Sequence, residues 1–206
     1  YFLGLGEIGM MKSTDEIKVY FVTIPAHKFL HIKNYESNGY WDFWQKQSLI
    51  PWQDCDTICG LLDSIKGKLD DRGGSEINCG SGQIMAYIND PKGRLCDWGF
   101  LRTECWGVRL PSNYKGEVPP QMFLIDIPEA EYIVFEHEPF QYEQENCSVE
   151  QKIETAMANF DYAAANCCLD TSPGRIMYFY YNPEQYFKYI RPIQNLKENV
   201  STSNET

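Results

Sequence analysis

The sequence GQIMAYINDP at Gly82–Pro91 recurs as GRIMYFYYNP at Gly174–Pro183, and this repeat decides the fold. Both copies begin with glycine, continue with an Ile-Met pair and an aromatic residue, and end with proline at the same spacing. A second match lies upstream, where Ile24-Pro25 and Ile127-Pro128 each precede an extended apolar stretch. Two matches in the same order indicate a tandem duplication.

Each half of the duplication is predicted to contain a strand, a helix and two further strands. Runs rich in β-branched and aromatic residues predict the first-half strands at Lys28–Ile32, Ile84–Ile88 and Leu101–Leu110. The corresponding second-half runs are Glu131–Phe135, Ile176–Tyr181 and Tyr186–Ile193. Between the halves, the segment Pro111–Pro120 has the glycine and proline content that is typical of a linker.

Helical spacing of apolar residues predicts one main helix in each half. The first carries a single apolar face made of Ile58, Leu61, Leu62, Ile65 and Leu69. Asp54 or Asp56 is available to cap it, and Trp41 and Trp44 indicate a short helix before it. The second shows the same spacing at Val149, Ile153, Met157 and Phe160. Ser148 and Gln151 predict a capping box at its start.

These elements predict an α+β chain in which each half has a sheet with one face under a helix. The faces left uncovered must then meet each other or enclose a space. A groove between two repeats is a common place for a small ligand. We therefore expect a ligand cleft between the two halves.

The charge of the chain limits its partners. The sequence has 206 residues, with 29 acidic and 18 basic side chains, and so a formal net charge of −11. Such a surface repels phosphate backbones and anionic lipid headgroups, so we expect no DNA binding by this chain alone and no membrane partner. The sequence contains neither an apolar run of the roughly 18 to 20 residues that span a bilayer nor a recognisable signal peptide, which favours a cytoplasmic location.

The eight cysteines are interspersed with apolar residues and include no CxxC pair: Cys55, Cys59, Cys79, Cys96, Cys105, Cys147, Cys167 and Cys168. A chain of this size does not need disulfides to be stable, so we expect all eight thiols to be reduced. The spacing of Cys55 and Cys59 would suit half of a metal site only with further Cys or His ligands, which are not close in sequence. We expect no metal and no cofactor.

The order of these motifs resembles a known family. The two strand-helix-strand-strand halves, the run DIPEAEYIVFEHEPF at Asp126–Phe140 and the closing run Gly174–Pro192 are similar to gyrase-inhibitor-like (GyrI-like) small-molecule-binding domains. Within this superfamily, the chain most resembles the effector-binding domain of AraC-type transcription regulators. The likeness covers about Ile17–Gln194.

The resemblance implies a fold and a role. The fold is two tandem βαββ (SHS2-type) modules with pseudo-twofold symmetry and a ligand cleft between the sheets. The role is to sense a hydrophobic or cationic effector or drug for a bacterial transcription regulator, with DNA bound only through an attached helix-turn-helix domain outside this chain. A homodimer is compatible with this role. Some relatives are instead stand-alone hydrolases of reactive electrophilic natural products, which keeps an enzyme as the alternative.

The resemblance also implies domain limits. Residues 1–15 are expected to be an N-terminal linker, because the chain begins with Tyr1 instead of Met. Residues 16–194 form the effector-binding domain, with repeat one at 16–111 and repeat two at 119–194. Residues 195–206 are rich in Asn, Ser, Thr and Glu and are expected to form a disordered tail.

Strand alternation sorts the candidate ligand-binding residues. Met85 and Tyr87 share one face, and Met177, Phe179 and Tyr181 match them in the second copy. Multidrug-sensing relatives carry a cleft glutamate where this chain has Phe179, so this face is expected to line the cleft and the family's anionic anchor is missing.

On the neighbouring strand, Glu104 and Trp106 share a face opposite Thr103, Cys105 and Gly107, whose small side chains suit a packed helix. Glu104 is then the candidate replacement for the anionic anchor, and Trp98 is expected at the mouth of the cleft. The expected ligand-binding residues are Met85, Tyr87, Trp98, Glu104, Trp106, Met177, Phe179 and Tyr181.

Two alternatives stay open for this strand. Trp106 can belong to the core, with Glu104 paired to Arg102 or Arg109 at the rim. For a hydrolase, Glu104 with Tyr87 or Tyr178 is the only plausible acid-base pair.

The three histidines carry less information. His27 and His31 lack a cysteine or carboxylate partner and are expected to be ordinary surface or core residues, and His137 is expected in a solvated acidic loop.

Overall fold

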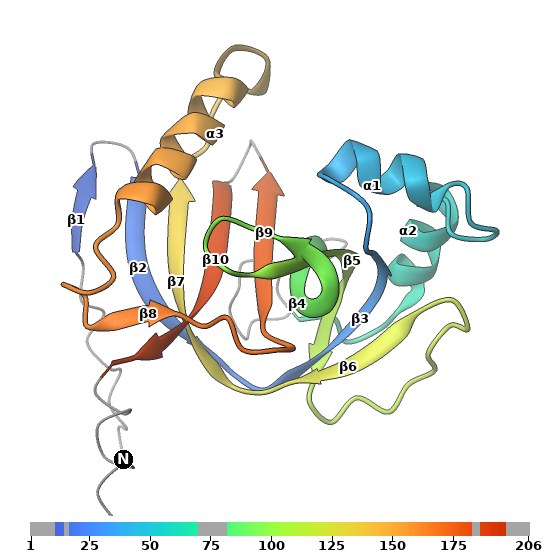
Figure 1. Cartoon of the computed structure of the whole chain (residues 1–206). Helices are drawn as coiled ribbons and strands as arrows, with labels where there is room; N and C mark the ends of the chain where they lie inside the picture. The colour runs from blue at the N-terminus through green and yellow to red at the C-terminus, as the bar shows by residue number, and fades with distance from the viewer. Residues whose placement is uncertain (1–10, 15–16, 70–81, 183–185, 197–206) are drawn as a thin grey trace, which may run out of the picture.

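The chain folds around one antiparallel sheet that carries three helices, an α+β architecture (Figure 1). The computed structural model describes residues 11–14, 17–69, 82–182 and 186–196. The strands are β1 Met11–Thr14, β2 Ile17–Ile24, β3 His27–Asn34, β4 Gln83–Leu95, β5 Leu101–Pro111, β6 Phe123–Ile127, β7 Ala130–His137, β8 Cys167–Leu169, β9 Ile176–Asn182 and β10 Tyr186–Asn195. The helices are α1 Tyr40–Gln47, α2 Cys55–Ser64 and α3 Tyr142–Asn159.

The sheet brings the two copies of the repeated motif together. The strand order is β1-β2-β7-β10-β9-β4-β5-β3-β6, and β8 pairs with the end of β10. The repeat strands β4 and β9 are therefore neighbours, with Met85 opposite Phe179 and Tyr87 opposite Met177. The residues that the repeat placed in equivalent positions thus come to lie side by side.

Most predicted elements are present. The six predicted strands lie within β3, β4, β5, β7, β9 and β10, and both first-half helices form. The second of these, α2, ends at Ser64, so Ile65 and Leu69 of its predicted apolar face lie outside it. Asp54 caps α2, since its side chain accepts a hydrogen bond from the backbone N–H of Thr57. The segment Met11–Thr14 was expected in the linker, but it forms β1 by pairing with β2. Residues 1–10 and 197–206, which hold most of the expected linker and tail, lie outside the described residues.

The predicted start of α3 is wrong. The helix begins at Tyr142, so Ser148 and Gln151 lie inside it, and the Ser148 hydroxyl donates to the backbone carbonyl of Glu145. Glu145 instead accepts from the backbone N–H of Gln141, the residue before the helix. Acidic side chains are favourable in a first turn, where the helix dipole is positive. The end of the acidic run therefore starts the helix, and of the expected loop only residues 138–141 lie outside β7 and α3.

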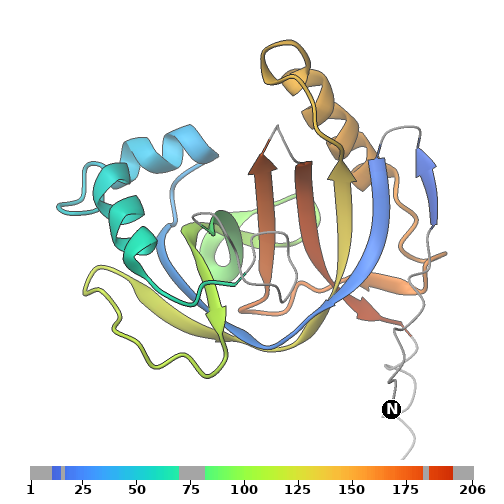
Figure 2. The same cartoon turned by 180° about the vertical axis from the view of Figure 1, so that it is seen from behind.

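The three helices pack on the same face of the sheet. Phe43 of α1 and Ile58 of α2 share a core with Met85 and Tyr87. Val149 and Ile153 of α3 share another with Phe135 of β7 and Phe187 of β10, and Phe179 and Tyr189 contact both cores. In both views, α3 and the α1–α2 pair flank β9 and β10 (Figures 1 and 2).

The opposite face of the sheet closes on itself as a third core. Its central members are Ile84, Ala86, Ile88, Cys105, Tyr178 and Tyr180. Strand alternation therefore separated the two faces correctly, but the expectation that a helix covers Thr103, Cys105 and Gly107 is wrong. Glycine at position 107 instead allows β5 to approach β3 closely. A Cβ there would overlap the Leu30 carbonyl oxygen and the His31 side chain of β3.

This close approach predicts the effect of a single methyl group. Gly107→Ala should lower the free energy of unfolding by about 1 to 3 kcal/mol, since the contacted backbone of β3 cannot rotate away. Gly60→Ala on α2 is the matched control, because a Cβ there meets nothing within 4 Å. It should instead raise the stability by about 0.5 to 1 kcal/mol through helix propensity. Chemical denaturation of both variants measures this, and equal effects would contradict it.

The described cysteines carry free thiols: Cys55, Cys59, Cys96, Cys105, Cys147, Cys167 and Cys168. Cys79 lies outside the described residues. The Sγ atoms of Cys55 and Cys59, one turn apart on α2, are 3.7 Å apart. In the described part of the chain, no helix combines the length and apolar character needed to cross a membrane.

Candidate ligand-binding site

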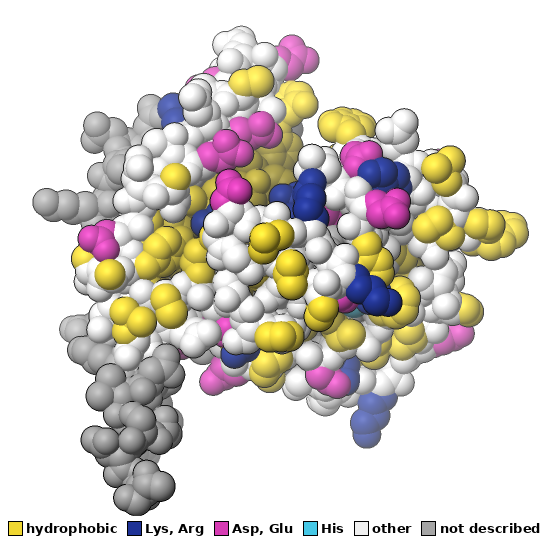
Figure 3. Space-filling view, in the orientation of Figure 1, with side chains coloured by type: hydrophobic (Ala, Val, Ile, Leu, Met, Phe, Trp, Pro, Cys, Tyr) yellow, Lys and Arg dark blue, Asp and Glu magenta, His cyan; other side chains and the backbone are white. Residues whose placement is uncertain are grey.

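A cavity of about 630 Å³ opens on the helix-bearing face of the sheet, between α1 and α3. Its floor comes from β4, β5, β9 and β10, and its sides from the start of α1 and one face of α3. Figure 3 shows hydrophobic side chains deep in the recess between the two helices. Nine of the sixteen lining residues are aromatic, so the cavity suits a flat apolar molecule.

The structure brings five of the eight expected ligand-binding residues to this cavity: Met85, Tyr87, Trp106, Phe179 and Tyr181. The other three do not line it. Met177 is buried in the core beneath, and Trp98 stacks on Phe100, with the ring centroids 4.6 Å apart. Glu104 is also buried beneath the cavity, with 1% of its surface exposed.

The aromatic walls hold one another in place. Trp106 makes edge contacts with Tyr40 and Trp44, each with 5.6 Å between ring centroids, and its indole N–H donates to Gln83 Oε1 at 2.8 Å. Across the cavity, the ring of Phe179 packs against the ring of Tyr189, with 4.8 Å between the ring centroids. Rings fixed in this way present apolar faces without a large loss of side-chain entropy on binding.

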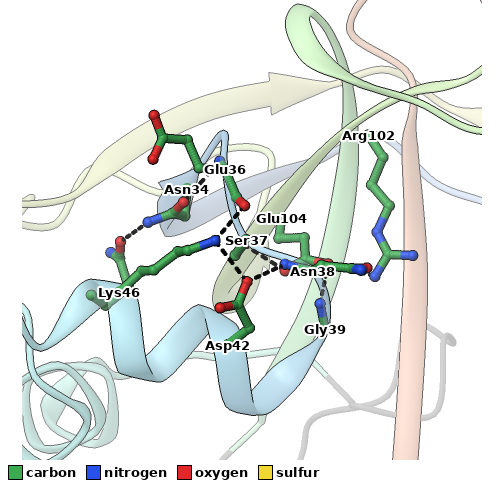
Figure 4. Close-up of polar contacts among 10 residues, drawn as sticks. Asn34, Glu36, Ser37, Asn38, Gly39, Asp42, Lys46, Arg102 and Glu104 are labelled. Atoms are coloured by element: carbon green, nitrogen blue, oxygen red, sulfur yellow. Dashed lines mark hydrogen bonds and ion pairs between the residues drawn. The ribbon is translucent and has the colours of Figure 1, made fainter.

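Glu104 lies under the turn that leads into α1 (Figure 4). Its carboxylate accepts hydrogen bonds from the Ser37 hydroxyl at 2.5 Å, the Gly39 backbone N–H at 2.7 Å and Arg102 Nη2 at 2.5 Å. The expected position of Glu104 in the cleft is therefore not the one the structure shows. Its side chain projects toward the cavity side of β5 as predicted, but residues 37–39 cover it. Of the alternative, the pairing with Arg102 is confirmed, but Glu104 is buried instead of lying at the rim, and Trp106 lines the cavity.

Arg102 is the cationic side chain that lines the cavity. Its guanidinium lies over the ring of Tyr87, 3.9 Å from the centroid, and is tied to Glu104 on one side. Burial opposes its charge, but Tyr87 and Glu104 raise the pKa of Arg102 further above its usual value. Burial also raises the pKa of the Tyr87 hydroxyl. At neutral pH the floor of the cavity thus holds a charged arginine over a neutral phenol.

Several lining residues were missed by the sequence analysis. Tyr142, Asn146 and Glu150 lie at successive i, i+4 positions of α3 and form one wall. This spacing was visible in the sequence, but the acidic composition of the segment suggested a loop. Tyr189 was missed because it was considered only as part of a strand, although it pairs with Phe179 across the β10–β9 ladder.

The candidate acid-base pairs are not assembled. Tyr178 lies on the opposite face of the sheet, where its hydroxyl is hydrogen-bonded to His27 Nε2. Tyr87 lies opposite Glu104 on the neighbouring strand, but Arg102 contacts both: its guanidinium lies over the Tyr87 ring and is hydrogen-bonded to the Glu104 carboxylate. In the described part of the chain, no three His, Cys, Asp or Glu side chains are grouped to hold a metal ion.

Of the two alternatives for His27 and His31, surface or core, the structure shows the core. His27 and His31 are core residues with 2% and 1% of their surface exposed. His137 was expected in a solvated loop, but it lies in β7 with 8% exposed, because the strand extends through the first part of the acidic run.

Comparison with known proteins supports the fold. No protein-family model matches the chain, and no curated protein sequence is similar to it. The structure of SAV2435 bound to tetraphenylphosphonium is similar, with a TM-score of 0.51 and 14% identity over 87% of this chain and 96% of that one. This agrees, at the level of the fold, with the resemblance to GyrI-like ligand-binding domains.

Two further solved structures are more distant. EcmrR in a DNA complex gives a TM-score of 0.47 and 10% identity over 87% of this chain, which spans 58% of the EcmrR chain. A hydrolase from Listeria innocua gives a TM-score of 0.44 and 13% identity over 85% of this chain and 91% of that one. With likenesses this distant, neither bears on the function of this chain.

Proposed function

We propose that this chain is a ligand-sensing domain that binds a small hydrophobic aromatic molecule in the cavity between α1 and α3. The observation that carries the proposal is the aromatic lining of a cavity of about 630 Å³, a volume within the usual range for small-molecule sites. The fold it shares with SAV2435, seen bound to tetraphenylphosphonium, gives further support.

We also propose that the ligand signal passes to an attached DNA-binding domain, as in AraC-type regulators. The chain itself has a net charge of −11, which opposes contact with phosphate. A regulator built this way would use this domain for the ligand and a separate domain for DNA. Such a protein would act in the cytoplasm.

The domain is proposed to be a duplication of two modules, repeat one at 16–111 and repeat two at 119–194. The strand order supports this, since β3-β5-β4 on one side of the sheet centre corresponds to β7-β10-β9 on the other. Each half also adds one strand to the sheet of the other half. Strand β2 of the first half pairs with β7 of the second, and β6 of the second half pairs with β3 of the first. This exchange makes one continuous sheet.

A hydrolase is the weaker proposal. A general acid or base needs a titratable group within reach of a bound substrate. Glu104 has both oxygens occupied beneath the cavity, and burial raises the pKa of the Tyr87 hydroxyl, so neither group is available as a general base. A sensing role needs neither group to titrate.

Binding of N-phenyl-1-naphthylamine, a neutral probe whose emission rises in apolar sites, tests the proposed function. Trp106→Ala should weaken its binding by about 10-fold to 100-fold, because a ring that forms the cavity wall is lost. Trp52→Ala is the matched control, since Trp52 is 76% exposed and does not line the cavity. Equal affinity in the two variants, each checked for its melting temperature, would contradict the proposed site.

A further inference from the structure

We propose that Arg102 is the polar anchor of the cavity and that the ligand is a neutral aromatic molecule bearing a carbonyl oxygen. The inference rests on the proposed function and names the ligand class for the same site. Of the hydrophobic or cationic ligands expected from the sequence, it selects a neutral one. It follows from how the charges on the cavity floor are already paired.

Arg102 has hydrogen-bonding capacity to spare. A guanidinium carries five N–H donors. Nη2 donates to Glu104, whereas Nη1 has no hydrogen-bond partner among the described residues. The Nε atom is buried and likewise has no acceptor among those residues. Because the side chain lines the cavity and is 22% exposed, the free end of the guanidinium can be reached by a ligand oxygen.

Glu104 acts as the positioning residue. It is tied to Ser37 and to the backbone N–H of Gly39, so its carboxylate is fixed where β5 meets the turn before α1 (Figure 4). The bond to Nη2 and the stack over Tyr87 then hold the guanidinium from two sides. An anchor held in this way loses little side-chain entropy when a ligand binds, which raises affinity.

The same pairing disfavours a cationic ligand. The ring face of Tyr87, which would attract a ligand cation, is occupied by the protein's own guanidinium. Both oxygens of Glu104 accept hydrogen bonds from the protein, so the floor offers no free carboxylate. Glu150 lines the cavity but is exposed on α3, where water weakens its attraction for a charge.

A carboxylate ligand is disfavoured for the opposite reason. The charge of Arg102 is already balanced by Glu104 at 2.5 Å. A second carboxylate on the same guanidinium would add like-charge repulsion within a partly desolvated site. A carbonyl oxygen accepts the N–H bond without that repulsion, so a neutral acceptor suits the remaining donor.

Three naphthalenes of similar size test the inference on the unmodified protein. They are 2-acetylnaphthalene, which carries a carbonyl, 2-isopropylnaphthalene, which has as many heavy atoms but no acceptor, and the cation 2-naphthylmethylammonium. We expect the ketone to bind about 10-fold more tightly than the hydrocarbon, as one hydrogen bond to a charged donor allows. The ammonium should bind most weakly. Calorimetric titration measures all three.

Variants assign the preference to Arg102. In Arg102→Met the ratio of ketone to hydrocarbon affinity should fall to about one, while the hydrocarbon affinity stays within about 3-fold. If that variant fails to fold because Glu104 is left unpaired, the double variant Arg102→Met with Glu104→Leu removes both charges and should show the same ratio. A merely structural role for Arg102 would lower both affinities and leave the ratio unchanged, which would overturn the inference.

The outcomes separate this inference from the proposed function. Equal binding of ketone and hydrocarbon would overturn the role of Arg102 while leaving an aromatic ligand site. Tightest binding of the ammonium, lost in Glu150→Gln, would overturn the inference in favour of a cation site at the rim. Failure of every naphthalene to bind would overturn the proposed function, and the inference with it.

Discussion

Replacing Glu104 by alanine is expected to lower the free energy of unfolding by about 3 kcal/mol, because it leaves a largely buried arginine without its counter-charge. The carboxylate is 1% exposed and receives hydrogen bonds from Ser37, Gly39 and Arg102. Removing the carboxylate leaves these three hydrogen-bond donors without an acceptor. Urea denaturation at pH 7 measures the loss.

The matched control removes the pair as a unit. The double variant Glu104→Leu with Arg102→Met replaces both charges by apolar side chains of similar length, so no unpaired charge remains on the floor. It should recover about half or more of the stability lost in Glu104→Ala. A double variant that is as unstable as the single one would show that the turn at residues 37–39, and not the charge pair, depends on Glu104.

The duplication was the most informative feature of the sequence, because it identified equivalent strands in the two halves. It did not predict that these strands pair: two sheets with a cleft between them were expected, whereas β4 and β9 are neighbours in one sheet. A local sequence signal also predicted the helix cap correctly where a single residue makes it: Asp54 caps the start of α2. By contrast, β2 and β6, which pair with β7 and β3 of the other half, were not predicted.

The side of the sheet that carries the cavity could not be read from alternation. A period of two separates Met85 and Tyr87 from Ile84 and Ala86, but it gives no sign of which set meets a helix. The sequence pattern therefore identified five of the ten floor residues and placed the helices on the wrong side of the sheet. The position of Glu104 depended on a turn 65 residues away in sequence, which no local pattern encodes.

The two buried histidines predict a strong loss of stability in mild acid. Burial lowers the pKa of His27 to about 4, with a smaller contribution from Arg109, and burial lowers the pKa of His31 to about 4 as well. His27 Nδ1 lies 2.7 Å from the Pro25 carbonyl and donates to it, so in the neutral ring Nε2 accepts from the Tyr178 hydroxyl. Protonation would force a second N–H toward that hydroxyl and place a charge beside Arg109.

The direction of the effect follows from proton binding. In the unfolded chain a histidine has a pKa of about 6.5, so between that value and about 4 the unfolded state binds more protons than the folded one. Stability is then complete above about pH 6.5 and falls as the pH falls toward 4. At pH 5 each histidine should have lost about 2 kcal/mol, so the pair should have lost about 4 kcal/mol.

Denaturation midpoints measured between pH 7 and pH 5 test this. The carboxyls whose pKa is lowered, such as Asp42 and Asp170, begin from an ordinary value of 3.8 and affect stability only at lower pH. The slope of stability against pH should correspond to nearly two protons at about pH 5.5. Replacing either histidine by glutamine should reduce that slope to about one proton. This holds whatever change the substitution causes in the free energy of unfolding at pH 7. A slope that is unchanged in both variants would mean that other groups cause the acid sensitivity, and a flat profile in the unmodified protein would show that neither ring is held neutral by the fold.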